Sequence, residues 1–207
     1  MLQRFHGGVS LPPTPPSASA WKERQAVKAE AKARIARSVV AAIPAGSTLM
    51  LGNGTTLVAV AQQLLKKTGL TVITHNLLAA SVLAEHPDCK LHVAGGLLRH
   101  RDSALEGDST VAFMKQFKVD IAIISAMGIE ADGSLRDLDR RETPVAQALI
   151  GQARETWLAV DVSKFNQTAL ASAATLSQVK RVFTEGLPPA PFPLMLHEAD
   201  IALTIAP

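Results

Sequence analysis

The sequence has little cysteine and few aromatic residues, and both shortages limit what the protein can be. Of its 207 residues only Cys89 is a cysteine, and tyrosine is absent. A single cysteine excludes an internal disulfide and a cysteine-based metal cluster, and it is typical of proteins of the reducing cytoplasm. Because aromatic residues make up only 4% of the chain, the core has to be built from small aliphatic residues, which suit helices packed closely on a sheet.

Long apolar runs and a strong charge imbalance are also missing. No apolar stretch approaches the ~18 residues that a membrane-spanning helix needs, and the N-terminus lacks the basic and apolar regions of a signal peptide. The formal net charge is +3, from basic residues that are scattered along the chain, so the charge gives no argument for nucleic-acid binding. The sequence therefore predicts a cytoplasmic protein with no membrane partner.

Several signatures of catalysis and cofactor binding are absent as well. The six histidines show no HExxH spacing for a metal, and there is no GxSxG pattern for a nucleophilic serine. Neither the dinucleotide pattern GxGxxG nor a nucleotide-binding GK[ST] occurs. We therefore expect no metal, no cofactor and no catalytic residue.

The chain divides by composition into an arm and one domain. Residues 11–20 read LPPTPPSASA, with four prolines that hold the backbone extended, so residues 1–20 are predicted to be a linker or surface arm. Residues 21–207 alternate between helical and strand patterns and are predicted to form a single domain.

That alternation predicts an α/β fold. Apolar residues at three- and four-residue intervals predict a first helix from Trp21 that ends at Pro44 and Gly46. Strands are predicted over 47–51, 70–74, 90–94, 119–125, 155–160, 179–184 and 201–205, and further helices over 57–67, 77–85, 109–117 and 143–154. Such a pattern indicates three layers, with a mostly parallel sheet between helices on both of its faces.

Polar and glycine-rich residues gather around the ends of these strands, where ligands of open α/β sheets bind. The segment GNGTT at residues 52–56 follows the first strand. Its glycines let backbone N–H groups approach an anion, and the next helix N-terminus is partly positive. The candidate ligand-binding residues are Asn53, Gly54, Thr55, Thr56, Thr74, His75, Asn76, Gly95, Gly96, Arg99, Asp120, Gly128, Glu142, Asp161 and Lys164.

Each cluster by itself also has a structural explanation. GNGTT could be a tight turn, Thr74 or Asn76 a helix cap, Arg99 part of a surface salt bridge, and Asp161 with Lys164 an ordinary structural pair. Five clusters that converge on one face of the sheet favour a shared ligand site over five unrelated explanations.

Taken in order, these motifs resemble the C-terminal sensor domain of the DeoR/GlpR family of transcriptional repressors. The stretch RFHGG at residues 4–8 is similar to the family's RxHGG, and Lys32 with Ile35 and Ala36 is similar to its EKxxIA helix, although Ala31 replaces the Glu. Gly54-Thr55-Thr56 is similar to the family's DSGTT loop, Thr74-His75-Asn76 to its strand end with Thr and Asn, residues 95–99 to its GGxxR, and residues 161–165 to its DxSKF. The spacing of Gly107, Asp120 and Gly128 and the position of Glu142 before a helix also fit the family's pattern. Gly and Asn at 52 and 53 remove the family's carboxylate before the GTT turn.

The resemblance implies a fold similar to ribose-5-phosphate isomerase and the CoA-transferases. It also implies a sensor that binds a phosphorylated sugar or related intermediate, which alters the DNA affinity of an attached winged helix-turn-helix. By this analogy Thr55, Thr56 and Lys164 hold the phosphate, and Arg99, Asp120 and Glu142 lie near the sugar. Few residues precede the RFHGG stretch here, so DNA binding is expected only through a helix-turn-helix that is missing from this sequence.

Two other functions are compatible with such a chain. One is a sugar-phosphate isomerase-like enzyme, in which Asp120 or Glu142 is the base and Lys164 the phosphate anchor. The other is a purely structural oligomerisation domain, which would not need polar clusters at its strand ends. Because the motifs follow the repressor pattern, we expect a non-enzymatic sensor, assembled as a homodimer or homotetramer.

Overall fold

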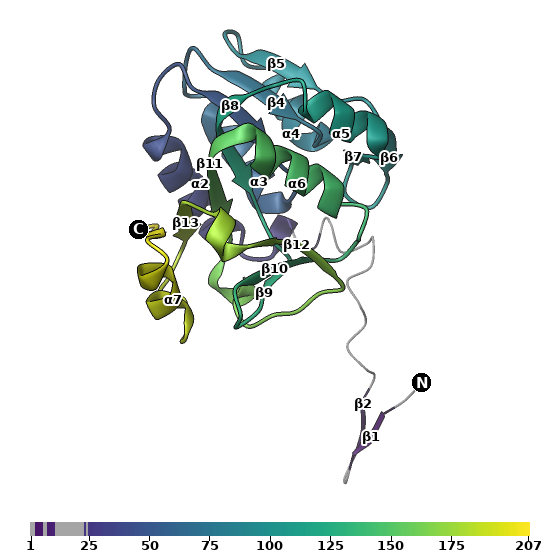
Figure 1. Cartoon of the computed structure of the whole chain (residues 1–207), viewed down its shortest axis with the longest axis vertical. Coiled ribbons are helices and arrows are strands. Elements are labelled where there is room, and N and C mark those ends of the chain that lie inside the picture. The colour runs from purple at the N-terminus through teal and green to yellow at the C-terminus, as the bar shows by residue number, and fades with distance from the viewer. Residues whose placement is uncertain (1–2, 6–7, 11–22, 24) are drawn as a thin grey trace.

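The computed structural model of the protein describes residues 3–5, 8–10, 23 and 25–207. Its centre is a seven-stranded sheet with the strand order β14-β13-β11-β8-β3-β4-β5 (Figure 1). All neighbouring strands in it run parallel. The strands are β3 (Thr48–Leu51), β4 (Thr71–Thr74), β5 (Lys90–Val93), β8 (Val119–Ile124), β11 (Ala153–Ala159), β13 (Arg181–Thr184) and β14 (Ala202–Ile205). Each strand overlaps a segment that the sequence predicts.

Helices cover both faces of this sheet, so the predicted three-layer α/β class is confirmed. One face packs against α2 (Ala29–Ala42), α3 (Thr55–Leu64) and α4 (Leu77–Leu83), and the other against α5 (Asp108–Met114), α6 (Thr143–Gln152) and α7 (Phe192–Glu198). The strands alternate between the two layers: Leu49 and Leu51 pack with the first set of helices, while Met50 between them packs with the second. Strands covered on both faces have to be apolar throughout, which is why their sequence signal is strong.

The first predicted helix is interrupted in the structure: residues 23, 25 and 26 are helical, residues 27 and 28 form a turn, and α2 follows. Its buried face carries Ile35, Ala36 and Val39, but α2 begins only at Ala29 because Lys28 has a left-handed backbone conformation, with φ 55° and ψ 35°. Residues 21, 22 and 24 of the predicted helix lie outside the described residues, as do residues 11–20 of the predicted arm. Before them, β1 (Gln3–Phe5) and β2 (Gly8–Ser10) pair antiparallel.

Short strands that the sequence does not predict form in the connecting segments. A hairpin consists of β6 (Leu97–Arg99) and β7 (Ala104–Glu106), and a three-stranded sheet consists of β9 (Gly128–Ile129), β10 (Ser134–Asp137) and β12 (Ala171–Thr175). The small sheet packs on the same core as α6 and α7, through side chains such as Ile129 and Leu135. Strands this short carry too few residues for a periodic signal, so their tertiary partners decide their conformation.

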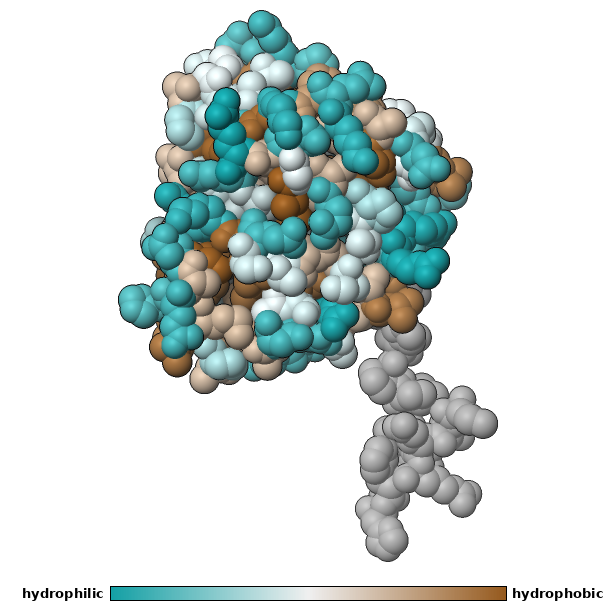
Figure 2. All heavy atoms as spheres, viewed as in Figure 1, coloured by the Kyte–Doolittle hydropathy of each residue, from teal (hydrophilic) through white to brown (hydrophobic). Residues whose placement is uncertain are grey.

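The face of the domain shown in Figure 2 is mostly covered by polar side chains, with apolar ones in small separate groups. None of the helices in the described part of the chain has the length and apolar character needed to cross a membrane.

Candidate functional site

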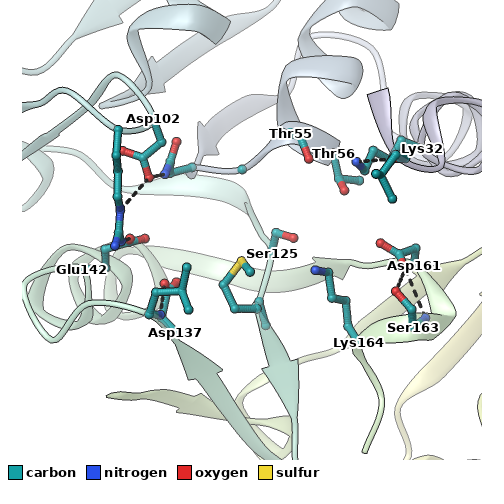
Figure 3. A pocket seen from close by; sticks show the side chains of 17 residues that line it. Lys32, Thr55, Thr56, Asp102, Ser125, Asp137, Glu142, Asp161, Ser163 and Lys164 are labelled. Carbon is teal, nitrogen blue, oxygen red and sulfur yellow. Dashed lines mark hydrogen bonds and ion pairs between the residues drawn. The ribbon is translucent and has the colours of Figure 1, made fainter. Parts of the chain in front are cut away.

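A cavity of about 90 Å³ lies at the carboxyl ends of β3, β8 and β11 (Figure 3). This volume is several times the ~10–15 Å³ that one water molecule requires, so the cavity has room for a small polar ligand. The predicted site residues that line it are Asn53, Gly54, Thr55, Thr56, Glu142, Asp161 and Lys164.

The GNGTT loop brings the N-terminus of α3 to the cavity. Gly54 precedes the helix with φ 133° and ψ 155°, a backbone conformation that L-residues with a side chain rarely adopt. A Cβ atom at Gly54 would lie 3.4 Å from the Cβ of Ser125 after β8. This close approach places Thr55 and Thr56 at the cavity wall, together with the partly positive first turn of a ten-residue helix.

The segment after β11 contributes a second set of polar groups. It continues into the short 3-10 helix η1 (Val162–Lys164), which Asp161 caps by accepting a hydrogen bond from the Ser163 N–H at 3.1 Å. Lys28 also donates to Asp161, at 3.3 Å. Although burial opposes the effect, the Ser163 hydrogen bond and the charges of Lys164 and Lys28 hold the pKa of Asp161 below its ordinary value. Asp161 is therefore a carboxylate that positions the loop carrying Ser163 and Lys164.

Lys32 completes this side of the cavity, and the sequence analysis did not name it as a site residue. It lies on the inward face of α2 with 6% of its surface exposed, and its ammonium group donates to the Val27 carbonyl oxygen at 2.7 Å. Figure 3 shows Lys32, Thr55, Thr56, Ser163 and Lys164 gathered on one side of the cavity. Two ammonium groups, three hydroxyl groups and a helix N-terminus form an anion-binding end.

The opposite side of the cavity is built on a buried ion cluster around Arg99. This guanidinium is 6% exposed; its Nε and Nη2 each donate to Asp102 at 2.8 Å. Nη1 donates to Glu106 at 3.1 Å, and Nη2 lies 2.8 Å from a carboxylate oxygen of Glu142. Arg99 is absent from the cavity lining, so it does not lie beside the sugar as predicted. Its contribution is indirect, because it holds Asp102 and Glu142, which do line the cavity.

Two of the acidic residues at this end, Asp137 and Glu142, interact with each other. Burial and the nearby charge of Asp137 raise the pKa of Glu142 to about 8, and these effects outweigh the attraction of Arg99. Arg101 also donates to Glu142, at 2.7 Å. Burial raises the pKa of Asp137 as well. The pair therefore keeps a proton near neutral pH, which makes this end of the cavity a mixed donor and acceptor surface.

This raised pKa predicts a pH-dependent stability. Unfolded Glu142 loses its proton near its ordinary pKa of 4.5, whereas the folded protein keeps that proton up to about 8, so the free energy of unfolding falls as pH rises through this window. His75 has the opposite effect, since its pKa is lowered from 6.5 to about 4, but that effect is complete above about pH 6.5. Between pH 6.5 and 8 we expect wild-type stability to fall by about 1–2 kcal/mol, and Glu142→Gln to remove most of that slope.

Urea unfolding at half-unit pH steps measures the effect. The control is Glu198→Gln, which removes a carboxylate on the exposed side of α7 and should keep the wild-type slope. A wild-type curve that is flat over this range would contradict the shared proton.

The residues after β4 divide between a structural role and the cavity. Thr74 donates to the Leu51 carbonyl oxygen at 2.7 Å, and the Asn76 side chain caps α4 by accepting from the N–H groups of Leu78 and Ala79, each at 3.1 Å. His75 lines a second, smaller cavity beside the first. Burial, and then the charge of Arg99, lower its pKa to about 4, so the imidazole is neutral at physiological pH.

Asp120 lies at the wrong end of its strand for the predicted role near the sugar. It is the second residue of β8, and its carboxylate accepts from the N–H and hydroxyl groups of Thr48 at 2.9 and 2.7 Å. Thr48 is the first residue of the parallel neighbour β3, so both residues mark the amino edge of the sheet. Side chains at this edge are a full strand length away from the ligand edge, and Asp120 instead ties two strands together.

Gly95, Gly96 and Gly128 are likewise absent from the cavity lining. Gly128 packs against the backbone of Gln167, and Gly96 packs against Thr110 and the backbone of Glu106. These contacts explain two of the glycines by close packing rather than by ligand binding.

Gly96→Ala is expected to destabilise the domain by about 2–4 kcal/mol. Gly96 has φ 150°, and a Cβ there would collide with the Thr110 hydroxyl and lie 2.7 Å from the Glu106 carbonyl oxygen, so backbone has to move. Gly95→Ala is the matched control because a Cβ at Gly95 meets nothing within 4 Å. Urea unfolding of the two variants checks this; equal stabilities would show that the hairpin adjusts without cost.

Comparison with known proteins identifies the family. The profile of the DeoR C terminal sensor domain matches residues 27–186, which is more than half of the chain. The protein belongs to the DeoR family. Its DeoR-family relatives include the glycerol-3-phosphate regulon repressor of Escherichia coli K12, 38% identical over 99% of this chain and 81% of that protein. The transcriptional repressor CsqR of the same organism is 32% identical over 99% of this chain and 78% of that protein.

The solved structure of an initiation factor supports the fold of this DeoR-family domain. The translation initiation factor eIF-2B of Pyrococcus horikoshii OT3 aligns with a TM-score of 0.57 and 19% identity, over 80% of this chain and 66% of that chain. Ribose-5-phosphate isomerase of Methanocaldococcus jannaschii aligns with a TM-score of 0.48 and 18% identity, over 65% of this chain and 53% of that chain. At such identities the likeness concerns the fold alone, while the named DeoR-family relatives are repressors.

Six polar residues line the cavity beyond the predicted set: Lys32, Arg101, Asp102, Ser125, Asp137 and Ser163. Two of them lie in segments that resemble DeoR-family motifs, Lys32 in the first helix and Ser163 in DVSKF, so the motif comparison could have found them. Asp102 and Asp137 come from the segments whose conformation the sequence predicts least, and only the fold brings them to the site.

Proposed function

We propose that this DeoR-family domain senses a small phosphorylated metabolite, whose phosphate group binds at the anion-binding end of the cavity. The observation that carries the proposal is the gathering of Lys32, Thr55, Thr56 and Lys164 in one cavity at the N-terminus of α3. Ammonium groups, hydroxyl groups and helix N-termini all bind phosphate in proteins.

The distribution of charge in the cavity favours a ligand with one phosphate group and no second acidic group. The far side carries the carboxyl groups of Asp102, Asp137 and Glu142, which would repel another acidic group. A ligand with one phosphate and an uncharged polar body satisfies both ends. The name of the E. coli relative, a glycerol-3-phosphate regulon repressor, supports the same class, which comprises phosphorylated polyols and sugars.

In a repressor, binding of this effector would change the affinity for DNA. A ligand shifts such an equilibrium only by its different affinity for the two conformations. Here the phosphate would contact α2, the start of α3 and the segment after β11 together, so it would favour the conformation in which these elements are closest. Assembly as a homodimer or homotetramer stays a prediction.

Isothermal titration calorimetry and thermal shift with a panel of phosphate esters test the proposal. The panel contains glycerol 3-phosphate, ribose 5-phosphate and fructose 6-phosphate, each paired with its unphosphorylated parent. A ligand at ~100 times its Kd should add ~2.7 kcal/mol of stability. We expect at least one ester to raise Tm while its parent does not; no response to any ester or to inorganic phosphate would contradict the proposal.

A turnover assay on the ester that binds distinguishes a sensor from an isomerase. The carboxyl of Glu142, whose pKa is raised to about 8, is a group in the lining that suits a general base. We expect the ester to be recovered unchanged after long incubation, because the named relatives are repressors. Conversion of ribose 5-phosphate to ribulose 5-phosphate would favour the enzyme.

A further inference from the structure

Two buried polar atoms at the inner end of the cavity have no hydrogen-bond partner within the described part of the chain: the Asn53 Oδ1 atom and the His75 Nδ1 atom. His75 is only 7% exposed. Both residues line the second cavity, of about 30 Å³, which shares Asn53, Ser125, Asp137 and Glu142 with the first. Buried polar atoms are nearly always paired, so two unpaired atoms on residues that line one cavity mark a place where a polar group of a ligand can bind.

The orientation of the Asn53 amide is fixed by its neighbours. Its Nδ2 group donates to Asp102 Oδ2 at 2.9 Å. A carboxylate only accepts hydrogen bonds, so a flipped amide would place oxygen against oxygen. Asp102 is in turn fixed by the two hydrogen bonds from Arg99, each of 2.8 Å. Arg99 thus acts as a positioning residue that, through Asp102, fixes the Asn53 Oδ1 atom as an acceptor.

The His75 ring supplies a different partner. It is neutral, because burial lowers its pKa to about 4, and a neutral imidazole has one nitrogen that donates and one that accepts. A hydroxyl group can donate to one atom and accept from another. A single hydroxyl group therefore satisfies both atoms when the imidazole proton is on Nδ1, because it accepts from the Nδ1–H group and donates to Asn53 Oδ1.

We propose that Asn53 and His75 form a hydroxyl-recognition subsite, which selects phosphate esters whose carbon chain carries a free hydroxyl group. This inference rests on the proposed function, since the phosphate has to bind at the other end. Figure 3 shows Asp102 and Glu142 on the side of the cavity opposite Lys32 and Lys164. A ligand anchored by its phosphate would extend its carbon chain toward the subsite.

An ester without hydroxyl groups offers neither atom a hydrogen-bond partner. The expected loss is about 10- to 100-fold in affinity, the usual effect of a buried polar atom left without its hydrogen bond.

Calorimetric titrations of wild-type protein, Asn53→Ala and His75→Phe test the subsite, with the tightest ester of the panel and with propyl phosphate, which carries no hydroxyl group. We expect wild type to prefer the hydroxylated ester by 10- to 100-fold. Each variant should lose most of that preference while its affinity for propyl phosphate stays within about 3-fold of wild type. His197→Phe, on the exposed side of α7, is the control and should keep the full preference.

Two results overturn the inference and leave the proposed function intact. One is equal binding of propyl phosphate and the hydroxylated ester by wild type, a comparison that needs no variant. The other is a preference that persists in both folded variants, whose folding is checked by Tm. Failure of every phosphate ester to bind wild type contradicts the proposed function itself, so the two failures are distinguishable.

Discussion

Arg99→Met is expected to lower the free energy of unfolding by about 3–5 kcal/mol at pH 8, the usual effect of removing one partner from a buried ion pair. Methionine keeps much of the side-chain volume but leaves two buried carboxyl groups and one partly buried carboxyl group without their shared cation. Asp102 and Glu106 are 4% and 2% exposed, and Glu142 lies 2.8 Å from the guanidinium. Urea unfolding measures the loss.

The loss should be smaller at low pH, which separates a charge effect from a packing effect. Without Arg99 the folded state buries negative charge that no guanidinium offsets, and this cost shrinks at low pH, where the cluster carries less negative charge. We therefore expect a smaller difference from wild type at pH 5 than at pH 8. Adding Glu142→Gln to Arg99→Met should recover part of the loss at pH 8, because glutamine removes the cost of protonating a group that is ionised in the unfolded chain at this pH.

Arg154→Met is the matched control. Arg154 lies 3.5 Å from Asp120, with side-chain exposures of 82% and 47%, and exposed ion pairs contribute little. Its loss should stay below about 1 kcal/mol. Equal losses in Arg99→Met and Arg154→Met, or a loss at Arg99 that does not depend on pH, would contradict the proposed role of the buried cluster.

Lys164→Ala is expected to weaken binding of the responding phosphate ester by about 10- to 100-fold, the contribution of a charge-assisted hydrogen bond. Lys164 lines the cavity beside Ser163 and opposite the start of α3. Its removal takes a positive charge from the anion-binding end and leaves the hydroxyl-recognition subsite unchanged. Calorimetry should show a similar loss for the ester and for propyl phosphate, since both present the same phosphate.

Lys180→Ala removes the same charge from an exposed position, where the lysine pairs with Asp200 at 2.8 Å, and it should bind the ester like wild type. Tm without ligand confirms that each variant is folded. If Lys164→Ala binds all esters as tightly as wild type, the phosphate is held elsewhere, and the anion-binding end has to be reassigned.

The alternation of apolar strands and amphipathic helices determined the fold class, because a strand buried on both faces has to be apolar along its whole length. Glycine chemistry likewise determined the turn at Gly54, whose φ of 133° is open to few other residues. The positions of Thr55, Thr56 and Lys164 in the cavity lining follow from the same rule, because residues directly after parallel strands meet at one edge of the sheet.

Strand direction and helix rotation were harder to predict. Asp120 was placed near the sugar although it begins its strand, and in a parallel sheet that position belongs to the amino edge. Lys32 belongs to a helix rich in charged residues, and only the packing of α2 on the sheet turns this one lysine inward, to 6% exposure. A helical pattern indicates an apolar face but does not say which polar residue at its border is buried.

The sequence by itself determined that this protein is a three-layer α/β domain with polar groups at its strand ends, because periodicity and glycine positions act locally. Only the tertiary structure decided which of those groups share a site. Arg99, Asp102, Glu106 and Glu142 meet in one buried cluster because the β6-β7 hairpin folds against the start of α6. That contact depends on long-range packing and leaves no periodic signal in the sequence.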